Sequence, residues 1–144
     1  MEFNKVTIVR VRKPGKKGLN EDLQWFSHSL GLFGSRDKEK SCFRVFVELI
    51  KASRRNRPLS SDEIAHRSNL SRATVIHHLT KLIESGLVLN LNNKYVLRVD
   101  NLEELVDEVK KDLLRVFDDL RFMAEELDDE LGLIKKRNNK VICD

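Results

Sequence analysis

The chain has 144 residues, of which 40% are hydrophobic and 35% are charged, enough for one buried core. No apolar run approaches the roughly 18 residues of a membrane-spanning helix, and the basic N-terminus lacks the apolar segment of a secretory signal, so we expect neither. Two distant cysteines, Cys42 and Cys143, provide no disulfide framework. They favour a reducing, cytoplasmic location, with Cys42 as a small core residue.

The net charge of +4 is unevenly distributed along the chain. Residues 1–100 contain 19 basic and 10 acidic side chains, whereas residues 101–131 contain 4 basic and 12 acidic ones. A basic body joined to an acidic segment indicates that one part of the protein meets a polyanion and the other does not.

The N-terminal segment, residues 1–19, is predicted to contain a short strand and a basic linker. Residues 3–12 (FNKVTIVRVR) alternate roughly and are rich in β-branched side chains, which favours a strand. The basic run RVRKPGKK, residues 10–17, either follows a DNA backbone as an arm or serves as a solvated linker. The sequence leaves both interpretations open.

Two helices are predicted next, over residues 20–33 and 37–53. Asn20 is a possible N-cap of the first, with acidic residues in its first turn. Apolar residues expected to pack the two helices onto the body are Leu23, Trp25, Phe26 and Leu30 in the first and Phe43, Phe46, Val47 and Ile50 in the second.

A helix-turn-helix is predicted after the stretch RRNRP, which interrupts the preceding helix. Ser60 and Glu63 form a capping-box pattern at the start of a short helix within LSSDEIAHRS. A tight turn leads to Ser71, the cap of a second helix that Gly86 ends. The buried stripe of that second helix is expected to comprise Val75, Leu79, Leu82 and Ile83. The basic stretch RRNR, residues 54–57, is either a phosphate contact or a solvated loop.

A β-hairpin is predicted after the second helix. Residues 87–91 and 94–99 are strand-like, and Asn92-Asn93 between them tolerates the left-handed conformations of a two-residue turn. The order of helix, short helix, capped helix and hairpin is that of a helix-turn-helix followed by a wing. Residues 20–99 are therefore predicted to form one such domain.

The last helix is predicted over residues 100–132, with a basic tail at 133–144. Its apolar positions recur at spacings of 4 and 3, a heptad seam typical of a coiled coil. The seam comprises Leu102, Val106, Val109, Leu113, Val116, Leu120, Met123 and Leu127. Because a small domain cannot cover so long a helix, we expect the seam to pair two copies of the chain, as in a homodimer.

The stretch LSSDEIAHRSNLSRATVIHHLTKLIESGLV, residues 59–88, resembles the DNA-binding core of ArsR-type winged-helix transcriptional regulators, especially archaeal ones. The matching positions are Ala65, Leu70, Ser71, Arg72, Val75, Leu79, Gly86, Leu87 and Val88. The resemblance implies a mainly α fold with a small β-hairpin wing, a winged helix-turn-helix followed here by the long C-terminal dimerisation helix. It also implies a sequence-specific regulator of transcription, by default a repressor.

The outward face of the second motif helix is the candidate DNA-reading surface. With Val75 and Leu79 buried, this face carries Arg72 and two His, and the free backbone donors at the helix start favour phosphate. Candidate DNA-binding residues are Ser71, Arg72, Ala73, Thr74, Ile76, His77, Thr80 and Lys81 on the helix and Asn92, Asn93 and Lys94 at the hairpin tip. Arginine suits guanine or phosphate, and small apolar groups suit the thymine methyl.

Alternatives remain at several of these positions and for the function as a whole. Arg72 and Lys81 also fit a solvated helix face, and Ile76 also fits packing against a neighbouring helix. An architectural chromatin protein would use the same surfaces with little sequence preference. A winged-helix protein-interaction module would present the basic face to an acidic partner.

Enzymatic, metal-dependent and effector-binding functions have little support in the sequence. There is no Gly-rich phosphate loop, no nucleophile elbow and no convergent Ser, His and acid set. Because neighbouring positions of a helix point about 100° apart, His77 and His78 are poorly placed to share a metal ion. We expect no catalytic residues, no metal, no cofactor and no small-molecule effector.

Overall fold

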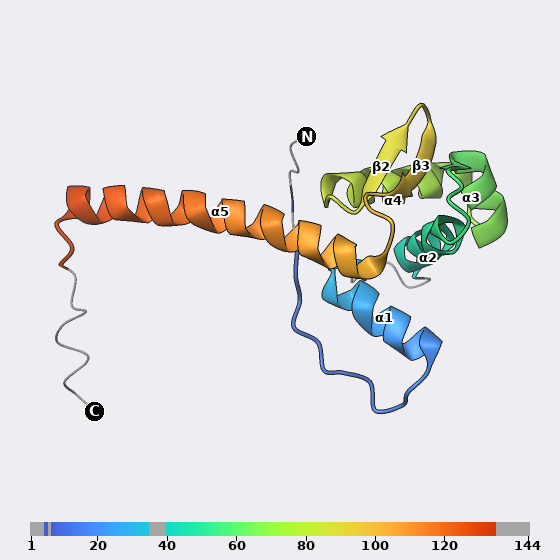
Figure 1. The fold of residues 1–144 in the computed structure, drawn as a ribbon, viewed down its shortest axis with the longest axis horizontal. Helices are drawn as coiled ribbons and strands as arrows, with labels where there is room; N and C mark the ends of the chain where they lie inside the picture. The colour runs from blue at the N-terminus through green and yellow to red at the C-terminus, as the bar shows by residue number, and fades with distance from the viewer. Residues whose placement is uncertain (1–4, 6, 35–39, 135–144) are drawn as a thin grey trace. The chain divides into compact units, whose positions relative to one another are not determined.

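The computed structural model describes residues 5, 7–34 and 40–134, which form a mainly helical protein with a small antiparallel sheet (Figure 1). The elements are α1 (Leu19–Ser29), α2 (Ser41–Ser53), β1 (Leu59–Ser60), α3 (Ser61–Ser68), α4 (Arg72–Glu84), β2 (Val88–Leu91), β3 (Lys94–Leu97) and α5 (Leu102–Leu131). The chain divides into two compact units, residues 1–109 and 110–144. The predicted fold class is confirmed.

Helix α2 is the centre of the core of the first unit, because it contacts α3, α4 and β3. Its fully buried side chains are Val45, Phe46 and Leu49, of which only Phe46 was predicted. The predicted stripe was too narrow: Phe43 is also buried, but Val47 and Ile50 are only half-buried. A helix covered from more than one side buries a wider face than the stripe of a surface helix.

The sheet has the strand order β1-β3-β2, and all neighbours are antiparallel. The predicted hairpin is confirmed: Val88 pairs with Leu97 and Leu91 with Lys94. Asn92 and Asn93 have φ values of 53° and 64°, as the predicted two-residue turn requires. Strand β1 was not predicted, since two residues carry no periodicity.

The N-terminal segment is not a strand in its described part, residues 5 and 7–12; residues 3, 4 and 6 lie outside the described residues. A strand needs a neighbouring strand, and here the backbone bonds to helices instead. The Val9 amide donates to the Ser29 carbonyl at 2.9 Å, and the Lys5 amide to that of Glu84 at 3.5 Å.

Helix α1 is shorter than predicted and is not capped by Asn20. Its N-cap is Gly18, and it ends at Ser29 because Gly31 has a φ of 74°. The Gly31 and Leu32 amides donate to the His28 and Ser27 carbonyls, which closes the last turn. Thr7 lies so close to Gly31 that a Cβ there would stand 2.9 Å from it, so this position requires glycine on two grounds.

The caps of both motif helices are confirmed. The Glu63 amide donates to Ser60 Oγ at 3.1 Å, and the Ser60 amide donates to Glu63 Oε1 at 3.2 Å. The Thr74 amide donates to Ser71 Oγ at 3.1 Å. The start of each motif helix is thus determined by local hydrogen bonds that the sequence already specifies.

The capping box also predicts how stability depends on pH. The hydrogen bond from the Ser60 amide, helped by Arg57 and Lys94, lowers the pKa of Glu63 below its usual 4.5. A lowered folded-state pKa stabilises the protein above pH 4.5, and this contribution is lost as the pH falls below 4.5.

We expect Glu63→Gln to reduce the loss of stability between pH 7 and pH 3, which urea denaturation at both values would measure. Glu48→Gln, which removes a carboxylate from α2, is the matched control. Equal acid sensitivity of wild type and Glu63→Gln would contradict this account.

Helix α5 has a buried start and an exposed apolar seam. Leu105 and Val109 are 0% and 4% exposed. Val109 was therefore wrongly assigned to the dimerisation seam: together with Leu105 it is buried by its own chain. Leu102 and Leu113 are half-buried. The five remaining seam positions are between 43% and 59% exposed: Val106, Val116, Leu120, Met123 and Leu127. The helix ends at Leu131, where Gly132 has a φ of 67°.

Candidate nucleic-acid interface

The outward face of α4 is open to solvent along its length. Seven of its eight predicted contact residues are exposed, namely Ser71, Arg72, Ala73, Ile76, His77, Thr80 and Lys81, and Thr74 is half-buried. Val75, Leu79 and Leu82 are at most 1% exposed and anchor the opposite face. Helix α4 is thus held by its apolar side while its mixed polar side stays free to meet a ligand.

The start of α4 combines a satisfied cap with a cationic side chain. Ser71 Oγ donates to Thr74 Oγ1 at 2.8 Å, so both hydroxyl groups serve the cap. Arg72 is 70% exposed, and among the described residues its side chain pairs only with Asp62, at 3.4 Å; Asp62 is itself 76% exposed. Because ion pairs in solvent are weak, Arg72 can leave Asp62 at little cost to reach a phosphate or a base.

The two histidines do not share the outward face. His77 is exposed, whereas His78 is 6% exposed, although their rings lie 5.3 Å apart. The prediction that both lie on the polar face was wrong for His78, which the helical turn rotates toward the core. Thr80 is exposed, but its hydroxyl donates to the Ile76 carbonyl at 2.9 Å and can only accept a bond from a ligand.

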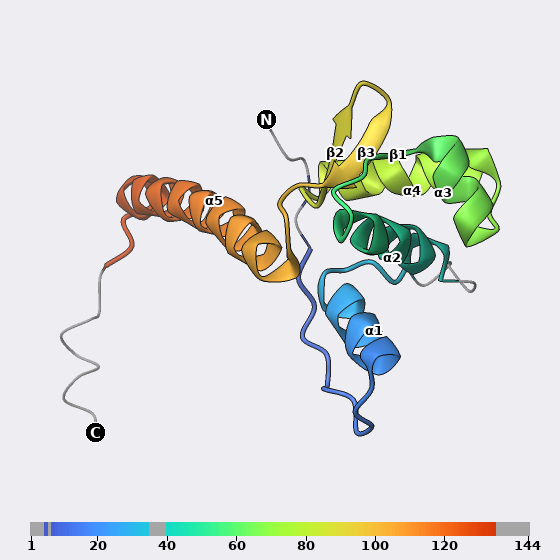
Figure 2. The same cartoon turned by 45° about the vertical axis from the view of Figure 1, so that its right-hand side comes forward.

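The hairpin tip supplies the other predicted contact residues. Asn92, Asn93 and Lys94 are all exposed, and the tip of the hairpin points away from α2, α3 and α4 in both views (Figures 1 and 2). The Asn93 amide donates to Asn90 Oδ1 at 2.8 Å, which stiffens the turn. The structure therefore presents α4 and the tip as two separate exposed elements of one compact unit.

Arg44 is a positioning residue that the sequence reasoning missed. Its guanidinium group donates to the carbonyl oxygens of Ser68 and Asn69, the latter at 3.4 Å. These two residues end α3 and begin the turn to α4, where Asn69 has a φ of 54°. Arg44 from α2 thus holds the turn that orients α4. A lone arginine between Phe43 and Val45 in an apolar helix was the available signal.

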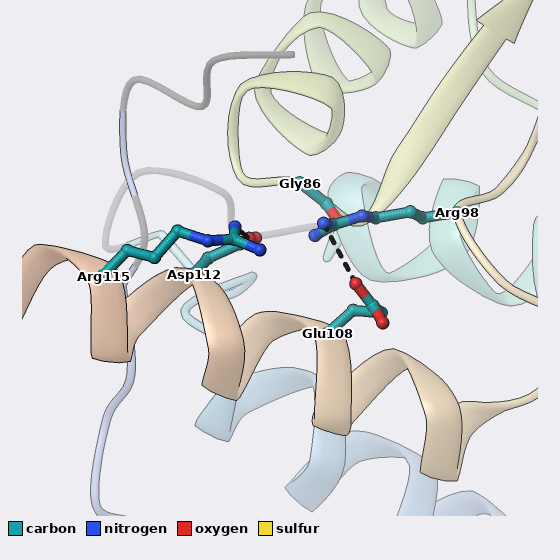
Figure 3. A network of polar contacts seen from close by, with 5 residues as sticks. All are labelled: Gly86, Arg98, Glu108, Asp112 and Arg115. Atoms are coloured by element: carbon teal, nitrogen blue, oxygen red, sulfur yellow. Dashed lines mark hydrogen bonds and ion pairs between the residues drawn. The ribbon is translucent and has the colours of Figure 1, made fainter.

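Arg98 connects the end of α4 to the start of α5, and the sequence reasoning missed it as well. Figure 3 shows its side chain between the Gly86 carbonyl group and the Glu108 carboxylate, each at 3.4 Å. Its backbone amide also donates to the Leu87 carbonyl at 3.0 Å. Further along α5, Arg115 donates to Asp112 at 3.0 Å (Figure 3).

The basic segment at residues 10–17 is anchored to α1. The Trp25 indole donates to the Val11 carbonyl at 3.0 Å, and the Lys13 ammonium group lies 6.0 Å from the centre of the Trp25 ring. Arg10, Arg12, Lys16 and Lys17 stay exposed. The anchoring makes the segment more than a free linker, and its exposed basic side chains face solvent.

The order of α3, turn and α4 is that of a helix-turn-helix, and the β2-β3 hairpin follows it. Residues 48–88 match the family described as winged helix-turn-helix DNA-binding. The fold is a winged helix-turn-helix. The match begins within α2 and ends at the first residue of β2, so it spans both motif helices, and the structure adds the wing. No curated protein and no solved structure matches the chain.

By its position in the winged helix-turn-helix, α4 corresponds to the recognition helix and the β2-β3 hairpin to the wing. The family match supports a DNA-binding regulator. Within the described residues, no helix is long and apolar enough to cross a membrane, and no group of three or more His, Cys, Asp or Glu side chains is placed to hold a metal ion.

Proposed function

We propose that the protein is a sequence-specific, homodimeric transcriptional regulator of the ArsR type, related to archaeal members and acting as a repressor. The exposed polar face of a capped α4, within a winged helix-turn-helix that matches a DNA-binding family, is the observation that carries the proposal. A protein with this function binds DNA in the cytoplasm. The function requires no enzymatic activity, cofactor or effector.

The mechanism follows from the exposed residues of α4 and the wing. Two recognition helices enter successive major grooves of a pseudo-palindrome, about 34 Å apart. Arg72 binds guanine or a phosphate, Ala73 and Ile76 contact thymine methyl groups, and Lys81 binds a phosphate. The wing tip, Asn92 to Lys94, contacts the adjacent minor groove. A bound dimer represses transcription by occluding the promoter.

We expect Arg72→Gln to weaken binding to the preferred sequence by about 10- to 100-fold, since a good base contact is worth about 1–3 kcal/mol. Lys81→Gln should weaken binding to all sequences and lower the salt dependence by about one phosphate. Fluorescence anisotropy with duplexes selected from a random library would measure both effects.

The same selection experiment tests specificity. We expect the selection to enrich a two-fold related sequence. Unselected duplexes should bind at least about 1,000-fold more weakly than this sequence. Arg121→Gln on α5 removes one charge outside the interface and is the control. A flat preference across sequences would favour an architectural protein, and unchanged DNA affinity in both interface variants would favour a protein-interaction module.

A further inference from the structure

A hollow of about 390 Å³ with a strongly basic lining lies beside the end of α2. It is lined by Lys51, Ala52, Arg54, Arg55, Arg57 and Arg67. Every lining side chain except that of Ala52 is cationic, and no acidic residue belongs to the described lining. We call this feature the arginine hollow. None of its residues belongs to the DNA-contacting set of α4 and the wing.

The positive charge of the arginine hollow is only partly neutralised. Lys51 lies 3.4 Å from Glu48, and Arg57 lies 2.9 Å from Glu63. The side chains of Arg54, Arg55 and Arg67 are exposed, and within the described part of the chain they have no hydrogen bond or ion pair. Three uncompensated guanidinium groups around one hollow repel one another, and a bound anion would relieve that repulsion.

The backbone that carries the arginines is held by hydrogen bonds. The Ala52 carbonyl accepts from the Arg55 amide at 3.0 Å and from the Arg57 amide at 3.2 Å. Between them Asn56 adopts a left-handed conformation, with a φ of 49°. The loop is therefore a closed turn, and it holds in place the backbone from which the arginine side chains extend.

Helix α3 also contributes to the hollow, through Arg67. Arg67 follows Glu63 by four residues, so the two side chains share one face of α3. The ion pair between Glu63 and Arg57 brings the loop over that same face. At the adjacent residue, Asp62 pairs with Arg72 of the recognition helix. The first turn of α3 thus connects the arginine hollow with the start of α4.

We propose that the arginine hollow binds clustered phosphate groups. The planar forks of guanidinium match the oxygen pairs of phosphate, which makes arginine the preferred residue for such anions. The phosphates belong either to the backbone of the duplex that α4 holds, in which case the proposal rests on the proposed function, or to a free oligophosphate.

The test uses the full chain and the double variant Arg54→Gln/Arg55→Gln. Lys110→Gln/Arg121→Gln on α5 changes the net charge equally and is the matched control. Inorganic tripolyphosphate is titrated by calorimetry, and duplex DNA by anisotropy over a series of salt concentrations. We expect the arginine variant alone to lose at least about tenfold in tripolyphosphate affinity, or to lower the duplex salt slope by about two.

The tripolyphosphate titration and the duplex salt slope distinguish the two sources of phosphate. A lower duplex salt slope assigns the phosphates to the DNA backbone, whereas loss of tripolyphosphate affinity with unchanged duplex binding assigns them to a free oligophosphate. Wild-type behaviour of the arginine variant in both titrations overturns the proposal. Failure of the proposed DNA-binding function would be seen separately, as an unchanged affinity of Arg72→Gln for duplex DNA. In that case the tripolyphosphate titration alone decides whether the arginine hollow binds phosphate.

Discussion

Replacing Leu120 and Met123 of α5 with glutamate is expected to convert the proposed homodimer into a monomer and to weaken binding to a two-fold related DNA sequence by about 100-fold or more. Both side chains are more than half exposed and occupy the heptad seam. Facing glutamates in a coiled-coil seam cannot be buried without a large desolvation cost. Once the two DNA-binding domains are separated, the gain from binding both half-sites together is lost.

Sedimentation equilibrium would follow the change, since one chain has a mass of 16.8 kDa. Leu114→Glu is the matched control, because Leu114 is 52% exposed on α5 but lies outside the seam. The control should stay dimeric and bind DNA like the wild type. A seam variant that also keeps the mass of two chains would show that the seam does not pair copies of this protein.

The largest loss of stability is expected from Phe46→Ala, which should lower the free energy of unfolding by about 3–5 kcal/mol. Phe46 is fully buried on α2, the helix that contacts α3, α4 and β3. Truncating it removes apolar contacts and leaves a cavity at the centre of the domain. A loss of this size is a large fraction of the total stability of about 5–15 kcal/mol usual for a protein.

Urea denaturation at one fixed protein concentration would measure the effect, because the proposed dimerisation would make stability depend on concentration. Phe122→Ala is the matched control, since Phe122 is 62% exposed; its effect should stay within about 0.5 kcal/mol. Similar losses for the two variants would mean that α2 is not the centre of the core.

Local features were predicted well because short-range chemistry determines them. The capping box at Ser60 and the cap at Ser71 depend only on residues three positions apart, and both are present. The Asn92-Asn93 turn follows from the tolerance of asparagine for positive φ. The buried and exposed sides of α4 follow from helical periodicity, apart from His78, which is buried, and Ile83, which is only half-buried.

Long-range contacts explain what the sequence reasoning did not predict. Residues 7–12 have strand-like composition, but a strand forms only with a partner, and the chain offers this segment the end of α1 instead. Arg44 and Arg98 act on carbonyl groups at least 12 residues away, which no local pattern reveals. The heptad spacing placed Val109 in the seam, but burial by its own chain removed it.

By itself the sequence determined the two motif helices, their caps at Ser60 and Ser71, the hairpin turn and the helix-turn-helix character of the DNA-binding segment, because each depends on neighbouring residues or on periodicity. Only the tertiary structure decided which apolar faces are covered, that β1 completes the sheet, and that Arg54, Arg55 and Arg67 meet around one hollow. Those outcomes depend on contacts between residues distant in the chain, which packing of the whole domain selects.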